Sequence, residues 1–193
     1  SLRTLILTSV KDALSPVKKK GYYLVEGRKI KKVPSNAEII WWEKFLLDGK
    51  KYHGTFHAER KAEDPAVILY SGGTTGTMKG ILLSNLNFNA LSQQIIATNP
   101  IYKPGDKMLA VMPIFHGFGL GVCIHTILSN GGRVLLIPRF NPESYAKLLK
   151  RHKPNFIAGV PTLYEALLRI KSLDRVDLSC LKGVFSGGDS LSI

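Results

Sequence analysis

The sequence predicts an α/β fold in which a mostly parallel sheet is covered by helices on both faces. Short apolar runs alternate along the chain with longer stretches at helical spacing, a pattern typical of parallel strands joined by helices. Most of the short runs are apolar at every position, as expected when neither face of a sheet meets water. The 193 residues, 45% of them hydrophobic, suffice for one core.

Six short runs are the strand candidates. They are Thr4 to Leu7, Ala66 to Tyr70, Met108 to Met112, Val134 to Ile137, Phe156 to Val160 and Gly183 to Phe185. We expect residues 1–63 to form a basic entry segment with a strand and an apolar helix. Residues 64–193 are expected to form the α/β subdomain.

Capping residues indicate where three helices begin. Ser84 can cap a helix that runs to about Ala97, and Asn141 can cap one that opens with Pro142. The second helix should end near Arg151, because Pro154 cannot continue it. A third helix is expected to open at Pro161 and Thr162, with one apolar stripe formed by Leu163, Leu167, Leu168 and Ile170.

The segment from Ala37 to Asp48 is apolar on nearly every side and stops at Gly49. We expect a buried helix under the sheet, since Glu43 and Lys44 interrupt any single apolar face. A helix lying on a membrane surface beside the neighbouring basic run is the alternative.

Positive charge is in excess. The net charge is +13, and residues 1–63 hold 14 Lys and Arg against 7 Asp and Glu, with the densest run from Lys18 to Lys32. Such an excess favours anionic partners: nucleotide phosphates, coenzyme A, anionic lipid or nucleic acid. A solvated basic hairpin is the plainer interpretation of the run.

The sequence favours a cytoplasmic protein, with peripheral attachment to an anionic membrane as an open alternative. It has no apolar run of the length that a membrane span needs, and its start lacks the order of a signal peptide. Cys123 and Cys180 lie far apart with no metal-ligand spacing. We expect both thiols to be reduced and buried.

The strongest local signal is the run from Tyr70 to Gly80, which reads Y-S-G-G-T-T-G-T-M-K-G. It holds four glycines, three threonines and a lysine in eleven residues. Glycines let the backbone approach a ligand, while N–H groups, hydroxyls and an ammonium attract phosphate. The run therefore predicts an anion cradle, with a glycine-rich surface turn as the alternative.

The run is not a Walker loop, because Gly80 rather than Ser or Thr follows Lys79. Apolar residues from Ile81 to Leu83 come next, before the capped helix. We therefore expect the loop to join two extended segments rather than a strand and a helix.

This run resembles the phosphate-binding signature of the adenylate-forming superfamily, [ST]-S-G-[ST]-T-G-x-P-K-G. The likeness continues through M-P-I-F-H-G-F-G from Met112, G-V-P-T from Gly159 and F-S-G-G-D-S-L from Phe185. Gly72 stands where the family usually has Ser, and Met78 where it usually has Pro. These departures remove one hydroxyl and some rigidity, but they leave the phosphate donors in place.

The resemblance implies an acyl-CoA synthetase of the long-chain fatty-acid type, using ATP, Mg2+ and coenzyme A. It activates a small-molecule carboxylate as the acyl-adenylate and passes it to the coenzyme A thiol; loading of a carrier-protein thiol is the alternative. The implied nucleotide-binding residues are Ser71, Gly72, Gly73, Thr74, Thr75, Gly76, Lys79, Gly187, Gly188, Asp189 and Ser190, with Thr75 also near the metal.

His116 is implied as the catalytic residue that shapes the acyl pocket. As a histidine beside aromatic residues, it could equally be a satisfied core side chain. Asp189 and Ser190 replace the commoner Ala and Pro of their segment, which leaves their individual contacts open.

The sequence is expected to be a piece of the large N-terminal domain, since it starts at Ser1 and stops at Ile193 directly after a glycine pair. The family's later magnesium-binding glutamate, ribose-binding aspartate and adenylation lysine lie beyond it. We therefore expect weak nucleotide binding and no catalysis by this chain alone.

Two other function classes are weaker. A hydrolase using the H-G-F-G run at His116 as an oxyanion loop lacks a G-x-S-x-G nucleophile motif. A basic nucleic-acid-binding module has charge in its favour but no stacking motif, so no nucleic-acid partner is expected.

Overall fold

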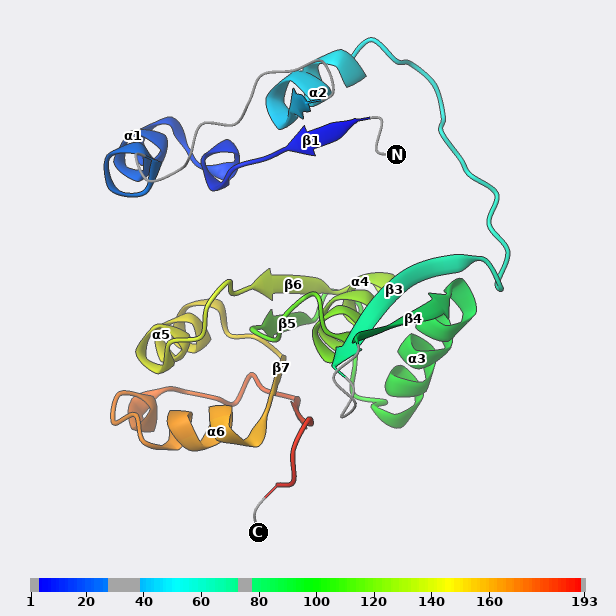
Figure 1. Cartoon of the computed structure of the whole chain (residues 1–193). Helices are drawn as coiled ribbons and strands as arrows, with labels where there is room; N and C mark the ends of the chain where they lie inside the picture. Colours follow the sequence, from blue (N-terminus) through cyan, green and yellow to red (C-terminus); the bar gives the residue numbers. More distant parts are fainter. Residues whose placement is uncertain (1–3, 28–38, 73–77, 192–193) are drawn as a thin grey trace. The chain divides into compact units, whose positions relative to one another are not determined.

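The chain forms two compact units, residues 1–58 and residues 59–193. The computed structural model describes residues 4–27, 39–72 and 78–191. Helices and strands alternate along the larger unit, which confirms the α/β class (Figure 1). Each unit is described by itself below.

The larger unit is built on a four-stranded sheet in which every pairing is parallel. The strands lie in the order β6-β5-β7-β8, so β6 and β8 are the edges. Their bounds are β5 (Lys107–Ala110), β6 (Arg133–Leu136), β7 (Phe156–Gly159) and β8 (Gly183–Ser186). The four strands expected here are confirmed, with ends within two residues.

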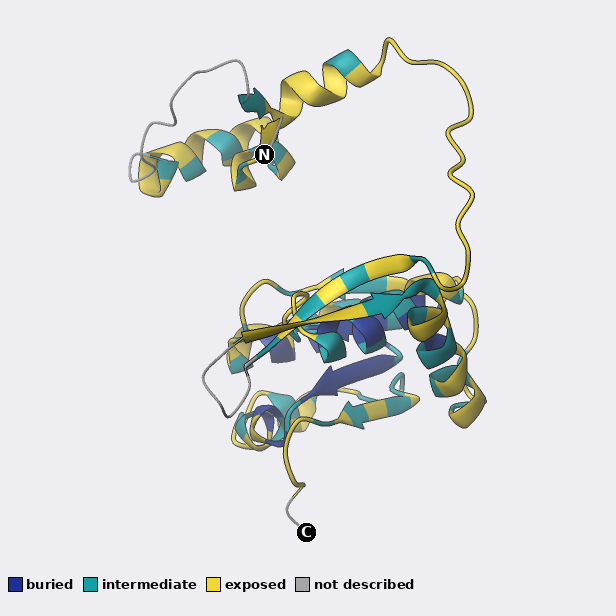
Figure 2. Cartoon of the chain, turned by 45° about the vertical axis from the view of Figure 1, so that its right-hand side comes forward, coloured by how far each residue is buried: buried dark blue, intermediate teal, exposed yellow. Residues whose placement is uncertain are grey.

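Both faces of this sheet are covered, because alternate residues of each strand point to opposite sides. Met108 and Phe156 pack with Ile127 on one face, where the π-helix η3 (Phe118–His125) and α4 (Thr126–Ser129) lie. Leu109 and Ile157 pack on the other face, against helices α5 (Pro142–His152) and α6 (Pro161–Leu168). In Figure 2 the central strands belong to the buried part of the unit.

The helices of this unit begin at the capping residues and prolines where the sequence predicted them. Helix α3 (Asn85–Thr98) begins after Ser84, whose hydroxyl accepts the N–H of Asn87 at 3.3 Å. Helix α5 (Pro142–His152) is capped by Asn141, and α6 (Pro161–Leu168) opens at its proline. The predicted stripe is wrong at its end: Leu168 is 82% exposed.

Helix α5 ends in a left-handed residue that is not glycine. Lys153 has φ 44° and ψ 63°, and its N–H donates to the carbonyl of Leu149 at 3.0 Å. Its ammonium lies 3.6 Å from Asp177. Hydrogen bonds from Ser179 come first among the causes that lower the pKa of Asp177, and Lys153 adds to them. A short 3-10 helix, η4 (Leu173–Arg175), lies between α6 and β8.

The remaining strands of this unit form an antiparallel hairpin, separate from the parallel sheet. Strand β3 (Pro65–Gly72) pairs with β4 (Met78–Ser84) and leads directly into α3. The expectation that the glycine-rich loop joins two extended segments is therefore confirmed.

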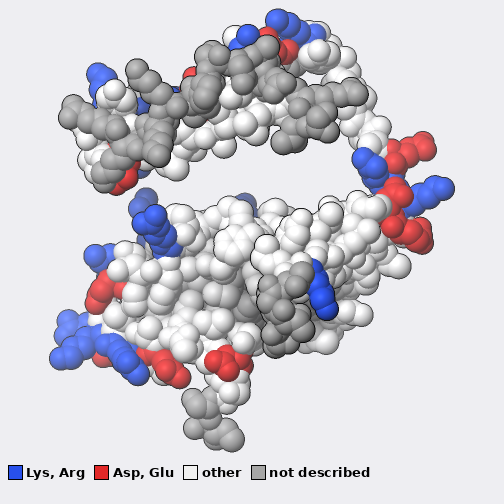
Figure 3. Space-filling model, viewed as in Figure 1, with Lys and Arg blue, Asp and Glu red and all other residues white. Residues whose placement is uncertain are grey.

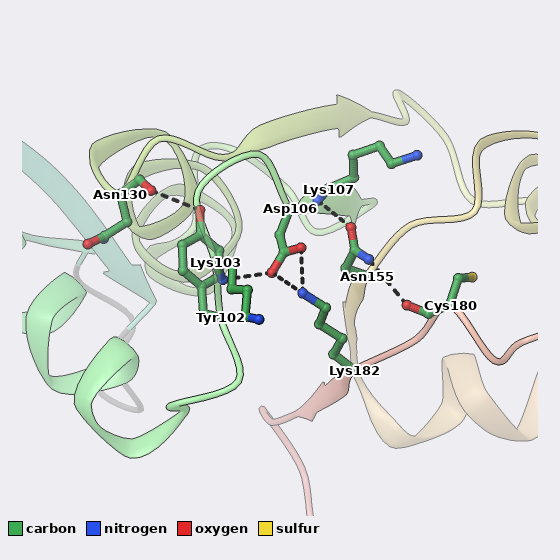
Figure 4. A network of polar contacts seen from close by, with 8 residues as sticks. All are labelled: Tyr102, Lys103, Asp106, Lys107, Asn130, Asn155, Cys180 and Lys182. Carbon is green, nitrogen blue, oxygen red and sulfur yellow. Dashed lines mark hydrogen bonds and ion pairs between the residues drawn. The ribbon is translucent and has the colours of Figure 1, made fainter.

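Charged and polar groups tie the amino ends of three parallel strands together (Figure 4). Lys182, before β8, reaches both carboxylate oxygens of Asp106, before β5, at 2.8 and 2.9 Å. The same carboxylate accepts the N–H of Lys103 at 2.8 Å. Asn155, before β7, accepts the N–H of Lys107 at 2.9 Å. This network fixes the edge of the sheet opposite to the strand ends at which the candidate site lies.

The smaller unit has a parallel strand pair, β1 (Leu5–Leu7) and β2 (Ile39–Trp41). Between the strands lie the 3-10 helix η1 (Val10–Ala13) and α1 (Pro16–Val25). The first part of the run from Lys18 to Lys32 is thus helical, so the hairpin interpretation is wrong there. The rest of that run lies outside the described residues.

Helix α2 (Trp42–Gly49) starts later than expected, because residues 39–41 are a strand. Its apolar side chains are exposed rather than buried: Phe45 by 43%, Leu46 by 49% and Leu47 by 61%. Within the smaller unit, the expected burial of this helix is therefore wrong. Over the described parts of the chain, we find no helix of the length and apolarity that crossing a bilayer requires.

The two cysteines differ in burial. Cys123 is fully buried and Cys180 is half-buried, and both are free thiols. The expected burial therefore holds for Cys123 alone. Burial raises the pKa of the Cys123 thiol to about 12.

Candidate active site

The glycine-rich run begins on one strand of the hairpin and ends on the other. Ser71 is paired with Lys79 across the two strands, and Gly72 is paired with Met78. Paired residues of antiparallel strands lie about 5 Å apart between Cα atoms. The structure therefore brings a hydroxyl and an ammonium of the predicted cradle to the same end of the hairpin. Gly73, Thr74, Thr75 and Gly76 lie outside the described residues.

Tyr70 and Gly80 form the next pair below the turn. A Cβ at Gly80 would lie 3.1 Å from Cγ2 of Ile68 and 3.4 Å from Cε1 of Tyr70. The tyrosine ring thus lies over Gly80, and the absence of a side chain there allows this packing. Gly80 therefore allows close packing in the hairpin, a role that its place in the motif did not predict.

The parallel strands bring the other predicted residues to one edge. Parallel strands end at the same side of a sheet, and His116 follows β5 while Gly187 follows β8. A Cβ at Gly187 would lie 3.7 Å from the Phe118 ring. Gly188, with φ 88°, has Val160 at 3.4 Å from its Cβ position. The segments after β5, β7 and β8 therefore meet.

The hairpin reaches this edge as well. A Cβ at Gly117 would lie 3.5 Å from Cδ1 of Leu69, which is two residues before Ser71 on β3. Strand β3 thus runs against the residue after His116. The structure places the described parts of the glycine-rich run and the His116 segment side by side.

His116 is exposed, which argues against the core-histidine alternative. Its Nδ1 accepts the N–H of Phe118 at 3.2 Å. A nitrogen that accepts a hydrogen bond carries no proton, so the neutral ring holds its proton on Nε2. The contact fixes the ring through Nδ1 and leaves Nε2 able to donate to a substrate oxygen.

The helix after His116 is a π-helix, a feature that the sequence did not predict. Gly119 is buried in it, and a Cβ there would collide with the carbonyl oxygen of Pro113. A Cβ at Gly121 would lie 2.8 Å from Cδ2 of Leu91. Thr126 donates to the carbonyl of Gly121 at 2.9 Å. π-helical turns are rare and frequent at functional sites.

Two apolar pockets open at the carboxyl edge. One of about 230 Å3 lies where residues after β5 meet residues after β7, lined by Val111, Met112, Phe140, Val160, Thr162 and Leu163. The chain continues from β5 to β6 on one side of this point and from β7 to β8 on the other side. Open α/β sheets bind ligands at such a point, where the strand order reverses.

The second pocket, of about 510 Å3, lies between the ends of β5 and β6 and has no charged residue in its wall. Its lining is Ala110, Val111, Met112, Pro113, Ile114, Phe115, Leu136, Ile137 and Pro138. The sequence did not predict that these residues line a pocket, although the run from Met112 to Phe115 belongs to the family motif. The available signal was apolar sequence that continues past the carboxyl end of two parallel strands. Figure 3 shows the charges of this unit grouped toward the borders of that view, with largely uncharged surface between them.

The other predicted residues are exposed or remain undescribed. Asp189 and Ser190 are exposed, and the carboxylate of Asp189 accepts the N–H of Ser190 at 2.8 Å. The described residues contain no group of three or more His, Cys, Asp or Glu that could hold a metal ion. Thr75, the predicted metal contact, lies outside them.

Comparison with known proteins agrees with this arrangement. Residues 4–193 match the family described as AMP-binding enzyme. The long-chain-fatty-acid–CoA ligase of Bacillus subtilis (strain 168) is 32% identical over 191 residues, which are 98% of this chain and 34% of that protein. The chain thus spans about a third of the length of this curated relative.

Solved structures share the fold. The ATP-bound MatB from Rhodopseudomonas palustris is 27% identical with a TM-score of 0.66, over 95% of this chain and 35% of that one. The inhibitor-bound N-terminal domain of FACL13 from Mycobacterium tuberculosis has a TM-score of 0.73 at 15% identity, over 98% of this chain and 46% of that one. With the family match covering nearly its whole length, the chain belongs to the AMP-binding enzyme family.

Proposed function

We propose that the complete gene product activates a carboxylate, a fatty acid in the first place, as its acyl-adenylate and transfers the acyl group to the thiol of coenzyme A. The observation that carries the proposal is the hairpin, which pairs Ser71 with Lys79 on either side of the glycine-rich turn. The relative from B. subtilis, a long-chain-fatty-acid–CoA ligase, supports the substrate class.

The reaction has two steps. A carboxylate oxygen attacks the α-phosphorus of ATP, the bond to the bridging oxygen breaks, and pyrophosphate leaves. The coenzyme A sulfur then attacks the acyl carbon, and AMP leaves. Chemistry of this kind depends mainly on positioning and on charge stabilisation.

The chain's own residues supply three contributions. Ser71, Lys79 and the backbone of the turn would hold the β- and γ-phosphates while charge builds on the leaving pyrophosphate. His116 would orient the acyl carboxylate through Nε2–H. The apolar wall after β5 would bind the acyl chain and exclude water.

Gly187 and Gly188, the two glycines after β8, lie at the carboxyl edge beside Phe118 and Val160. We assign them, with Asp189 and Ser190, to the nucleotide wall. Magnesium usually keeps several waters and is shared with substrate phosphates, so Thr75 suffices as its proposed protein contact.

A binding experiment tests the phosphate site. Lys79→Ala should weaken MgATP binding to the 193-residue chain by about tenfold, because a charge-assisted hydrogen bond to phosphate is lost. Titration calorimetry measures this. Lys147→Ala, an exposed lysine of α5, is the matched control and should leave the affinity unchanged. Equal affinity of the Lys79→Ala variant and the wild type would remove Lys79 from the site.

Activity tests require the complete gene product, since we propose that the 193 residues alone bind nucleotide weakly and catalyse nothing. Carboxylate-dependent exchange of pyrophosphate into ATP, measured over carboxylates of increasing length, identifies the substrate. Coenzyme A compared with a carrier-protein thiol as acceptor separates the two ligase alternatives. Exchange catalysed by the isolated chain would contradict the proposed inactivity.

The cytoplasmic location and the contact with an anionic membrane stay predictions. The exposed apolar side chains of α2 and the basic residues of the smaller unit are the groups that would meet such a membrane.

A further inference from the structure

The smaller unit contains a pocket that the proposed reaction does not use. It has a volume of about 450 Å3, within the range of small-molecule sites. It opens where the parallel strands β1 and β2 end, since Leu7 and Trp41 are their last paired residues and both line it. Helix α1 closes another side with Tyr22 and Tyr23. All of these residues belong to the one unit, residues 1–58.

The wall of this pocket is mainly apolar and carries three aromatic side chains, those of Tyr22, Tyr23 and Trp41. Flat rings give a large contact area for an apolar ligand at low entropic cost. Gly27 completes the wall, and a Cβ there would lie 2.9 Å from Cδ2 of Tyr23. A highly charged ligand such as a nucleotide does not suit these surroundings.

The charge of the pocket is positive and incompletely compensated. Two ammonium groups line it, those of Lys11 and Lys19. Lys19 is paired with Glu43 at 3.1 Å. Lys11 lies over the Trp41 ring, 5.7 Å from its centroid, and has no carboxylate partner among the described residues. A cation without a carboxylate partner in the described part of the chain, placed beside an apolar wall, is complementary to a ligand with one negative charge and an apolar body.

We propose that this pocket binds a small amphipathic carboxylate, with its apolar chain against the three rings and its carboxylate against Lys11. Its wall is formed by residues of the smaller unit alone, and none of them belongs to the proposed nucleotide or acyl site. It therefore does not depend on the proposed ligase activity.

Trp41 makes the proposal directly measurable. Trp41 and Trp42 are the two tryptophans of the chain, so Trp42→Phe leaves Trp41 as the single fluorescent indole. In that background, titration of the 193-residue chain with monomeric decanoate should change the emission saturably. Decanol, which has the same chain length without the charge, should bind more weakly.

Two substitutions should shift the affinity in opposite directions. Lys11→Gln should weaken decanoate binding by about threefold to fivefold, as expected for the loss of a partly exposed ion pair. The affinity for decanol should stay the same. Glu43→Gln releases Lys19 and should strengthen decanoate binding by a similar factor. Lys20→Gln, on α1 but outside the pocket wall, is the matched control. It should change neither the affinity for decanoate nor the affinity for decanol.

Several results would overturn the proposal. Equal affinities for decanoate and decanol, or no effect of Lys11→Gln in a chain whose circular dichroism is unchanged, would remove the carboxylate contact. A Trp41 signal that responds to phosphatidylglycerol vesicles but not to decanoate would assign this surface to a membrane contact instead. Lys79→Ala should bind decanoate at Trp41 with the wild-type affinity. A failure of the ligase proposal can therefore be distinguished from a failure of this one.

Discussion

At the scale of single residues, the buried Tyr145 and the half-buried Tyr164 differ in whether the hydroxyl has a hydrogen-bond partner. Tyr164 on α6 donates to the carbonyl of Phe185 on β8 at 2.6 Å. Tyr145 on α5 is buried to 1% exposure, and its hydroxyl has no hydrogen-bond partner among the described residues. A buried polar group without a partner costs free energy, whereas a bonded one contributes to stability.

Tyr145→Phe should therefore raise the free energy of unfolding by about 1 kcal/mol, since it removes an unpaired hydroxyl and keeps the ring. Tyr164→Phe should lower it by about 1 kcal/mol, because the carbonyl of Phe185 loses its donor. Urea denaturation of both variants measures the difference. Two changes of the same sign would show that Tyr145 has a partner in solution.

The same tyrosines give the protein a pH dependence in alkali. Burial is the main cause that raises the pKa of both Tyr145 and Tyr164 above the ordinary value of 10.0, and the charge of neighbouring groups adds to it. The unfolded chain loses these protons before the folded chain does. The free energy of unfolding should thus fall as the pH rises above about 10, and the fall should be smaller in Tyr145→Phe.

At the scale of elements, the helix after His116 has its closest backbone approach at Gly119. The chain turns so tightly between Pro113 and Gly119 that no side chain fits at Gly119. By contrast, a Cβ at Gly117 would make an ordinary contact with Leu69 at 3.5 Å. The cap residue Gly117 should therefore tolerate alanine, whereas Gly119 inside the π-helix should not.

Gly119→Ala should lower the free energy of unfolding by about 3 kcal/mol, because the added methyl group forces the backbone apart. Gly117→Ala is the matched control and should change it by less than about 1 kcal/mol. Chemical denaturation followed by circular dichroism gives both values. If both variants were equally stable, the close approach of Pro113 to this helix would be absent in solution.

The elements also show what local sequence can predict. Helices α3 and α5 begin where Ser84 and Asn141 are, because a cap acts on the backbone within three residues. The π-helix was missed because it depends on the carbonyl of Pro113 and on Leu91, which no periodic pattern encodes. The exposure of Leu168 was missed for the same reason, since burial depends on which elements pack together.

For the site, the sequence predicted that the glycine-rich run and the segments after β5 and β8 contribute residues. The prediction was possible because each motif directly follows a recognisable strand. It could not predict the apolar pockets between strand ends, which arise from the strand order β6-β5-β7-β8. Nor could it predict that Nδ1 of His116 is occupied by a backbone N–H. Contacts across the sheet decide these features.

At the scale of the whole molecule, the two units are joined by a segment with little protection. Every residue from 49 to 63 is exposed, and none from 50 to 64 belongs to a helix or strand. Both signs of charge occur along it, as Figure 3 shows. The larger unit begins its own hydrogen bonds at Lys61, whose carbonyl accepts the side chain of Asn85 at 2.9 Å.

Brief digestion with trypsin should therefore cut after Arg60 or Lys61 early and leave a resistant piece that extends toward the C-terminus. Exposed irregular backbone enters a protease more readily than a helix does, so Lys147 and Lys150 in α5 should be cut later. Mass spectrometry identifies the ends. Arg60→Gln combined with Lys61→Gln should slow the appearance of this piece, and early cleavage within α5 would contradict the assignment of the units.

The end of α5 has a practical consequence for engineering. Lys153 adopts a left-handed conformation that disfavours side chains with a Cβ, and the chain keeps it there although glycine is the residue best suited to the geometry. Its ammonium is the partner of Asp177, a contact on the surface that contributes little. A thermostabilised version of this protein should accordingly be sought first at Lys153, far from the hairpin turn, where a gain in rigidity leaves ligand recognition intact.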